Sequence, residues 1–272
     1  MVFRMTIQEE GFLASEIDIF VQRHRVAHAP AFALASDLNR LGQNALRRKN
    51  VVGEAFSDVE PLIFLLLVRT LSNFQGAILM AERGALVESR TLSRSCLETV
   101  FCLAALAGGS DDFIQRLSSA LLAERKNMAN WILQKPAVRE AMGQLNIDKV
   151  KRFVDEMSAL LHTPRKLGIE EMARQGGLEP LYIWYRQLSG DAAHISLDAL
   201  ERYVVEGDGG DQEIRWGPDC DGEELELTVL LSCNWLFAAL RAADGRFGID
   251  IDRADLAVLW ERFQSQYPQA GG

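Results

Sequence analysis

Residues 61–83 read PLIFLLLVRTLSNFQGAILMAER, and this stretch decides the fold. Its first half is apolar nearly all round, which is typical of a helix buried at the centre of a protein. Polar residues from Arg69 onward interrupt the run well before the roughly 20 apolar residues that a membrane span needs. The stretch therefore predicts a core helix from about Asp58 to Arg83 rather than a membrane segment.

Helical patterns continue on both sides of this stretch. Residues 86–107 form a second apolar helix that ends at a Gly-Gly pair. β-branched residues at 202–206 and a matching segment at 213–216 flank a turn rich in Gly and Asp. Further helices are expected at 110–134, 179–200, 222–243 and 253–263. The predicted fold class is mainly α, a multi-helix bundle with one small β-hairpin inserted near residues 202–217.

The chain has 272 residues, a length that allows one hydrophobic core or two. Two amphipathic helical patterns in residues 1–50 predict an N-terminal helical extension packed on or beside the bundle. Residues 55–266 are predicted to be the helical bundle domain. We find no repeat of solenoid length and no low-complexity linker.

The net charge of −9 is concentrated in one place. Between Asp198 and Glu226 there are 11 acidic and 2 basic residues, and the rest of the chain is balanced. Such a patch makes nucleic-acid binding at the hairpin unfavourable. The N-terminus carries no secretory pattern, and the four cysteines form no C-x-x-C pair, so we expect a cytoplasmic protein with free thiols and no membrane association.

The common signatures of cofactor and metal sites are absent from the sequence. There is no GxGxxG, GxxxxGK[ST], GxSxG or HExxH motif. His24 and His28 have a zinc-compatible spacing but no obvious third ligand, and the acidic segment 219–226 fits a calcium loop poorly. We therefore predict no cofactor and no metal site.

Three polar groups on the predicted core helices are candidate sites. Arg94 and Glu98 lie four residues apart on one helix face, together with Arg90 one turn earlier. They form either a structural ion pair between helices or a clamp for an anion. The arginine side chains are candidates for the second role because a guanidinium binds carboxylates and phosphates in a planar fork.

The other two groups lie on the helices at 61–83 and 179–200. Arg69 and Asn73 are candidate binding residues that could face Arg94 and Glu98 across the bundle. Ser189, Asp191 and His194 follow on the later helix, Ser189 as a binding candidate. The candidate catalytic residues are His194, Glu98 and Asp191, with His194 as the acid or base, although a histidine of this kind is usually structural.

Three stretches resemble a bacterial helical family catalogued as domain of unknown function 5677. They are the helix 66–83 with Arg69, the segment ESRTLSRSCLE at 88–98, and YRQLS at 185–189 followed by His194. The resemblance covers roughly residues 55–245 and implies an all-helical fold without supplying a reaction. It directs attention to Arg69, Arg94, Glu98, Ser189 and His194.

A looser similarity is to the HEPN helical toxins, whose ribonuclease motif has an arginine followed by a histidine after 4 to 6 residues. Here seven residues separate Arg186 from His194, which departs from that pattern. Our first hypothesis is a non-enzymatic or regulatory interaction module in bacterial defence or stress, with a protein partner. A homodimer is the base-rate expectation for its assembly. The alternatives are a small-molecule binder or enzyme with a buried Arg/Glu/His pocket, and a divergent HEPN-like ribonuclease.

Overall fold

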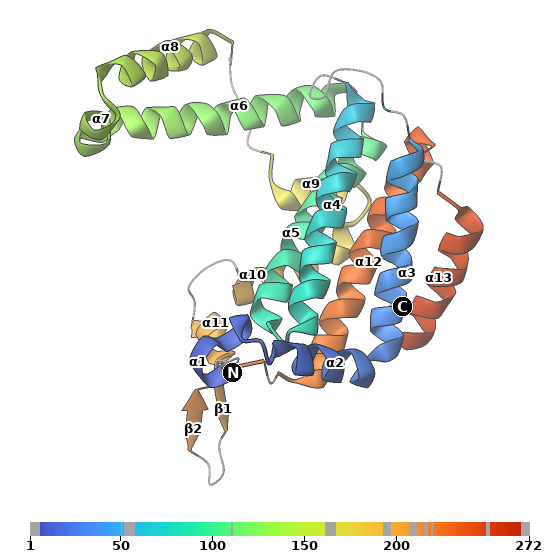
Figure 1. The fold of residues 1–272 in the computed structure, drawn as a ribbon. Helices are drawn as coiled ribbons and strands as arrows, with labels where there is room; N and C mark the ends of the chain where they lie inside the picture. Colours follow the sequence, from blue (N-terminus) through green and yellow to red (C-terminus); the bar gives the residue numbers. More distant parts are fainter. Residues whose placement is uncertain are drawn as a thin grey trace.

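The computed structural model describes residues 6–49, 51, 58–109, 111–160, 167–192, 197–206, 211–214, 217–218, 220–248 and 251–267. Three long helices form the centre of the bundle, α4 (Val59–Glu82), α5 (Leu86–Gly108) and α12 (Gly222–Phe247). In Figure 1 α4 and α5 run side by side, and α12 lies against both. The prediction of a mainly α bundle with a small hairpin is confirmed.

Smaller helices surround this centre. On one side α3 (Ala29–Arg48) packs on α12 and α4, and α13 (Arg253–Gln266) packs on α3. On the other side α9 (Ile169–Gln175) and α10 (Tyr182–Ala192) pack on α5. The remaining short elements are α1 (Ile7–Glu10), η1 (Gly11–Leu13), α2 (Ile17–Ala27), η2 (Glu179–Leu181) and α11 (Leu197–Glu201).

The core lies where the three central helices meet. Phe74 of α4, Phe101 of α5 and Trp235 of α12 are fully buried there. Leu34 and Leu38 of α3 belong to the same buried cluster. Burying each such side chain contributes about 1.5–3 kcal/mol, so these helices hold most of the stabilising apolar surface. The division into an extension at 1–50 and a bundle at 55–266 stays a prediction.

The turn between α4 and α5 depends on Gly84. Its φ is +72°, a left-handed conformation that side chains rarely adopt. A Cβ at this position would lie 2.0 Å from the carbonyl oxygen of Pro218 and 2.9 Å from the ring of His24. The glycine therefore lets the turn, α2 and the segment before α12 approach one another closely.

The helix predicted at 179–200 differs from the structure at its start. The structure has the 3₁₀ turn η2, then α10, and after residues 193–196, which lie outside the described residues, the short helix α11. Pro180 lies in the 3₁₀ turn, and proline is tolerated at a helix start but not inside one. Of this region, Leu188 of α10 is fully buried in the core.

Three helices form an arm that projects from the bundle (Figure 1). We call α6 (Asp111–Gln134), α7 (Pro136–Met142) and α8 (Gln144–Leu160) the arm. Within it α6 and α8 pack against each other, with Ala129 and Ile147 buried. The predicted hairpin consists of β1 (Val204–Glu206) and β2 (Gln212–Ile214), which pair antiparallel with Val204 opposite Ile214.

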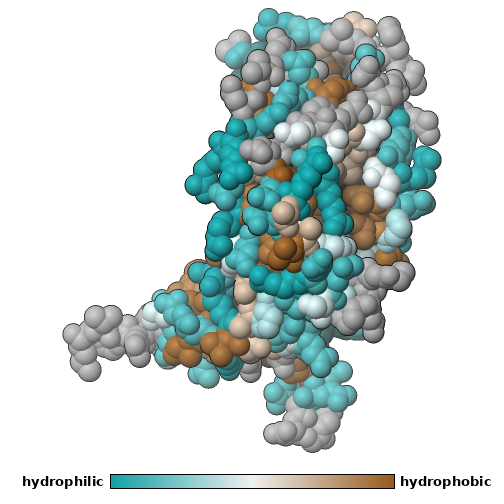
Figure 2. All heavy atoms as spheres, turned by 90° about the vertical axis from the view of Figure 1, so that its right-hand side faces the viewer, coloured by the Kyte–Doolittle hydropathy of each residue, from teal (hydrophilic) through white to brown (hydrophobic). Residues whose placement is uncertain are grey.

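Two described helices, α4 and α12, are long and apolar enough to cross a membrane by length and composition alone. Core helices of a bundle pass the same test, and α4 and α12 pack against α5. Figure 2 shows the face to which α3 and α13 belong, where hydrophobic side chains form small separate patches among hydrophilic ones.

Candidate functional site

The structure brings together three of the predicted site residues, Arg94, Glu98 and Ser189. Arg94 Nε donates to Ser189 Oγ at 2.8 Å, and Arg94 Nη2 donates to Glu98 Oε1 at 2.9 Å. The hydroxyl of Tyr185 accepts from Arg94 Nη2 at 3.0 Å and donates to Glu98 Oε1 at 3.0 Å. The four side chains close a network between α5 and α10.

Aromatic rings hold this network in place. The Arg94 guanidinium lies 5.0 Å from the centre of the Tyr185 ring, within the range of a cation–π contact. Tyr182 stacks on Tyr185, and Phe101 meets Tyr185 edge-on. Arg94 uses its Nε proton and both protons of Nη2 for its partners in the network, so the guanidinium of α5 is tied to side chains of α10. The geometry is therefore that of a cross-link between two helices.

The other predicted site residues do not join this network within the described part of the chain. Arg69 lies on the exposed surface of α4. Asn73 is partly buried, and its Nδ2 atom has no hydrogen-bond partner there. Asp191 lies near the end of α10, although its side chain is not described, and His194 lies outside the described residues. The catalytic roles assigned to Asp191 and His194 stay predictions.

A second polar network lies between α5 and α12. The buried Arg90 pairs with Glu224 at 3.3 Å and approaches Thr228 Oγ1 at 3.5 Å. Arg202, which comes from the segment before the hairpin, forms an ion pair with the same Glu224 carboxylate. Glu224 therefore neutralises two arginines, and Arg90 has the structural ion pair that its burial requires.

Ser93 continues this network one turn further along α5. Its Oγ accepts hydrogen bonds from Trp235 Nε1 and from Ser232 Oγ, each at 3.0 Å. All three residues are fully buried. Satisfied polar groups of this kind fix the rotation of α12 against α5, since any other register leaves the indole N–H unpaired.

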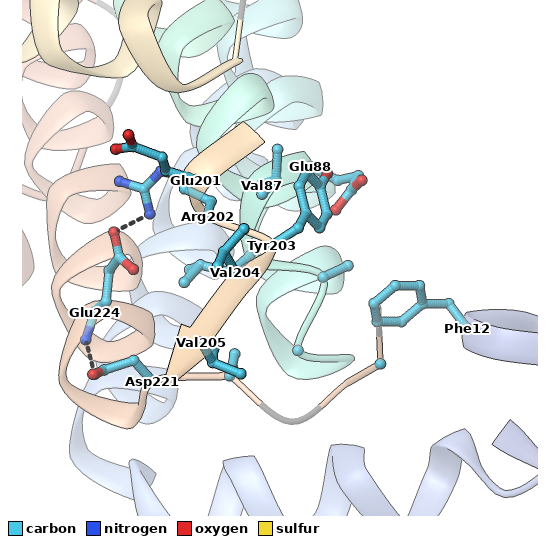
Figure 3. A pocket seen from close by; sticks show the side chains of 15 residues that line it. Phe12, Val87, Glu88, Glu201, Arg202, Tyr203, Val204, Val205, Asp221 and Glu224 are labelled. Atoms are coloured by element: carbon cyan, nitrogen blue, oxygen red, sulfur yellow. Dashed lines mark hydrogen bonds and ion pairs between the residues drawn. The ribbon is translucent and has the colours of Figure 1, made fainter. Parts of the chain in front are cut away.

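A cavity of about 390 Å³ lies where the α4–α5 turn, the first strand and the start of α12 meet (Figure 3). We call it the acidic cavity, because four carboxylates and one guanidinium line it. Asp221 is engaged as the N-cap of α12, where it accepts a hydrogen bond from the Glu224 N–H at 3.0 Å. Glu224 is engaged by arginines, so Glu88 and Glu201 provide the exposed negative charge.

Glu88 and two aromatic rings form the outer part of the acidic cavity. Figure 3 shows Glu88 and Tyr203 at its upper side and Phe12 beyond them, on a different element. Burial raises the pKa of the Tyr203 phenol, and the negative charge of Glu88 raises it further. Both side chains line the same part of the acidic cavity, where Figure 3 shows the Glu88 carboxylate next to the Tyr203 ring. A carboxylate with aromatic rings beside it is an environment that suits a cation.

His24 and His28 each contact another helix. His24 Nδ1 lies 3.0 Å from the carbonyl of Glu82, and His28 Nδ1 lies 2.8 Å from Glu226 Oε2. The two histidines contact different helices, and the described residues contain no cluster of metal-ligating side chains. The four cysteines are free thiols, of which Cys96 and Cys233 are buried.

The fold and these two networks define a mainly α-helical bundle protein in which polar side chains of α5 join it to α10 and α12. The model of a family of unknown function (DUF5677) matches residues 60–211, which is more than half of the chain, and the chain belongs to that family. No curated protein and no solved structure matches the chain significantly. The HEPN-like and bacterial parts of the resemblance stay predictions.

Sequence reasoning did not identify the acidic cavity. Glu88 lies in the family-like segment 88–98, whereas Phe12 and Tyr203 lie in stretches that predict a helix and a strand. The three residues lie far apart in the chain, so no local pattern joins them. The signal that pointed this way was the acidic patch at 198–226, to which Glu201, Asp221 and Glu224 belong.

Proposed function

We propose that this protein is a non-enzymatic interaction module that binds a basic segment of a protein partner at the acidic cavity. The observation that carries the proposal is Glu88 beside Tyr203 in a cavity of about 390 Å³ with Phe12 at its edge. A lysine or arginine side chain can place its cationic end against the carboxylate and its methylene stem along the rings.

The charge around the cavity favours a peptide over a single small amine. The acidic patch continues beyond the cavity onto the exposed hairpin residues Glu206, Asp211 and Glu213. A small cation would use only Glu88 and its neighbours, whereas an extended basic segment can also approach these carboxylates. Complementary charge of this kind raises the association rate and selects the partner.

The residues predicted for catalysis support this proposal indirectly. Glu98, a candidate catalytic carboxylate, is hydrogen-bonded to Arg94 and Tyr185, which supports a role in joining α5 and α10 rather than a role as a free catalytic group. A binding role needs no such group. The bacterial defence or stress setting is an expectation from the family resemblance alone.

The test is a titration of a fluorescein-labelled oligolysine peptide, followed by fluorescence anisotropy at low salt. We expect saturable binding that weakens as salt is added, because exposed charges are screened. Glu88→Gln and Tyr203→Ala should each weaken binding about tenfold, the effect of losing about 1.4 kcal/mol of contact energy. Spermidine should compete only weakly.

Glu261→Gln is the matched control, since Glu261 is an exposed carboxylate on α13. It should bind the peptide like the wild-type protein. Equal affinities for the wild type, Glu88→Gln and Tyr203→Ala would refute the proposal. Spermidine binding with no peptide binding would instead support the small-molecule alternative. Circular dichroism checks that every variant keeps its helical content.

A further inference from the structure

A stripe of four residues runs along the outer side of the arm. Glu124, Met128, Trp131 and Lys135 follow at intervals of four, three and four residues, the spacing with which one helix meets another. The first three lie on α6, and Lys135 stands directly after its last residue. The stripe is exposed, with Met128 at 61% and Trp131 at 49% of full exposure.

Exposure of this kind is unusual for these residue types. Tryptophan and methionine are enriched at protein interfaces, and tryptophan is among the residues that most often dominate binding energy. Here they line an open apolar depression of about 410 Å³ on the surface of α6, together with Glu124 and Asn127. The neighbouring face of α6, which carries Ala129, is already buried. α6 therefore has a second apolar surface, the stripe, in addition to the face that is already buried.

We infer that the arm binds the arm of a second copy of this chain, with the two α6 helices antiparallel. The stripe is complementary to itself about a two-fold axis that crosses α6 between residues 129 and 130. In that arrangement Met128 faces the partner's Trp131, and Glu124 faces the partner's Lys135. Each contact occurs twice, as the symmetry of such an interface requires.

Both kinds of contact are favourable. A thioether beside an indole ring is a recurrent attractive contact, and it buries the two most exposed apolar side chains of the arm. Glutamate opposite lysine fixes the antiparallel direction, because a parallel pairing places Glu124 beside a second glutamate and Lys135 beside a second lysine. A partner of unrelated sequence would have to supply the same order of charge and apolar groups.

The position of the arm leaves room for this pairing. The arm projects from the bundle, and the axis lies toward its outer end, near α7 (Figure 1). The partner's bundle then lies beyond that end rather than against the first bundle. The acidic cavity is formed by other elements, so dimerisation and the proposed peptide binding are independent of each other.

The test measures the dimerisation constant of the full chain by sedimentation equilibrium. It compares the wild type with variants in which the charges at positions 124 and 135 are reversed singly and together. We expect the wild type to dimerise and Glu124→Lys or Lys135→Glu to weaken dimerisation about tenfold or more, since each change brings two like-charge contacts. The double variant carrying both changes should recover the wild-type constant. Trp131→Ala should weaken dimerisation further than either charge change.

Glu261→Lys is the control for net charge, because Glu261 lies on α13 outside the arm, and it should dimerise like the wild type. A wild-type protein that stays monomeric would overturn the inference. So would a dimer whose constant is the same in all variants, or single charge changes that the double variant does not rescue. The peptide titration does not depend on this result, so failure of one proposal is distinguishable from failure of the other.

Discussion

At the scale of single residues, three of the polar side chains that were predicted as a site are hydrogen-bond and ion-pair partners of one another. Arg94, Glu98 and Ser189 were predicted as a possible site, and they do meet, but they do so with Tyr185 as a closed network. Sequence spacing could place Arg94 and Glu98 on one face, since both lie on one helix. It could not supply Tyr185 and Ser189 as their partners, because α10 is brought to α5 only by packing.

Arg69 shows the opposite case. Its spacing from Asn73 and Gly76 suggested a polar stripe facing Arg94, yet the structure places it on the exposed surface of α4. A helix that is apolar nearly all round gives little periodic signal, so its sequence does not reveal which side faces the core. The buried side of α4 carries Leu67, Thr70 and Phe74 instead.

Ser93 provides a prediction at this scale. Ser93→Ala removes the acceptor of Trp235 Nε1 and leaves a buried indole N–H unpaired, which should lower the free energy of unfolding by about 1–3 kcal/mol. Urea denaturation monitored by circular dichroism measures the change. Ser72→Ala is the matched control, since Ser72 lies exposed on α4, and it should stay within about 0.5 kcal/mol of the wild type. Equal stability of the two variants would show that the Ser93 network contributes nothing.

At the scale of elements, the sequence predicted the long helices well. The start of α12 is an example, because a helix was predicted from residue 222 and α12 begins at Gly222, with Asp221 as its N-cap. Of the arm helices, α6 was also predicted, at 110–134. Their projection from the bundle was not, since an amphipathic pattern indicates that a helix face is covered but not by what.

The turn between α4 and α5 gives a prediction at the scale of elements. Gly84→Ala forces a side chain into a left-handed conformation and against the Pro218 carbonyl, which should cost about 2–4 kcal/mol of unfolding free energy. Gly245→Ala lies inside α12 with open space around it and should stabilise the protein by about 0.5–1 kcal/mol. Thermal unfolding of the two variants measures both effects. A Gly84→Ala protein that melts with the wild type would contradict this account of the turn.

At the scale of the whole molecule, the two proposed binding surfaces lie at separate places. The exposed acidic residues Glu206 and Glu213 lie on the hairpin near the acidic cavity, whereas the exposed Met128 and Trp131 lie on the arm. The sequence showed the first of these features, because the acidic residues between 198 and 226 are close together along the chain. The cavity itself required Phe12, Glu88 and Tyr203 to be brought together by folding.

The central claim is that a basic peptide binds at the acidic cavity. Cys220 lines this cavity, so the reactivity of its thiol tests the claim at that place. The other three thiols are expected to react slowly, because burial raises the pKa of Cys102 to about 12 and raises those of Cys96 and Cys233 further. At pH 8 these three stay protonated, and the protonated thiol is a poor nucleophile. Alkylation of the native protein should therefore report on Cys220.

The most direct measurement is the rate at which iodoacetamide alkylates Cys220, followed by mass spectrometry with and without saturating oligolysine peptide. The account predicts that the peptide slows alkylation of Cys220 several-fold in the wild type, because it occupies the acidic cavity, and that Glu88→Gln loses much of this protection. An alkylation rate that does not change while the peptide is bound would place the peptide elsewhere on the acidic patch and would contradict the account.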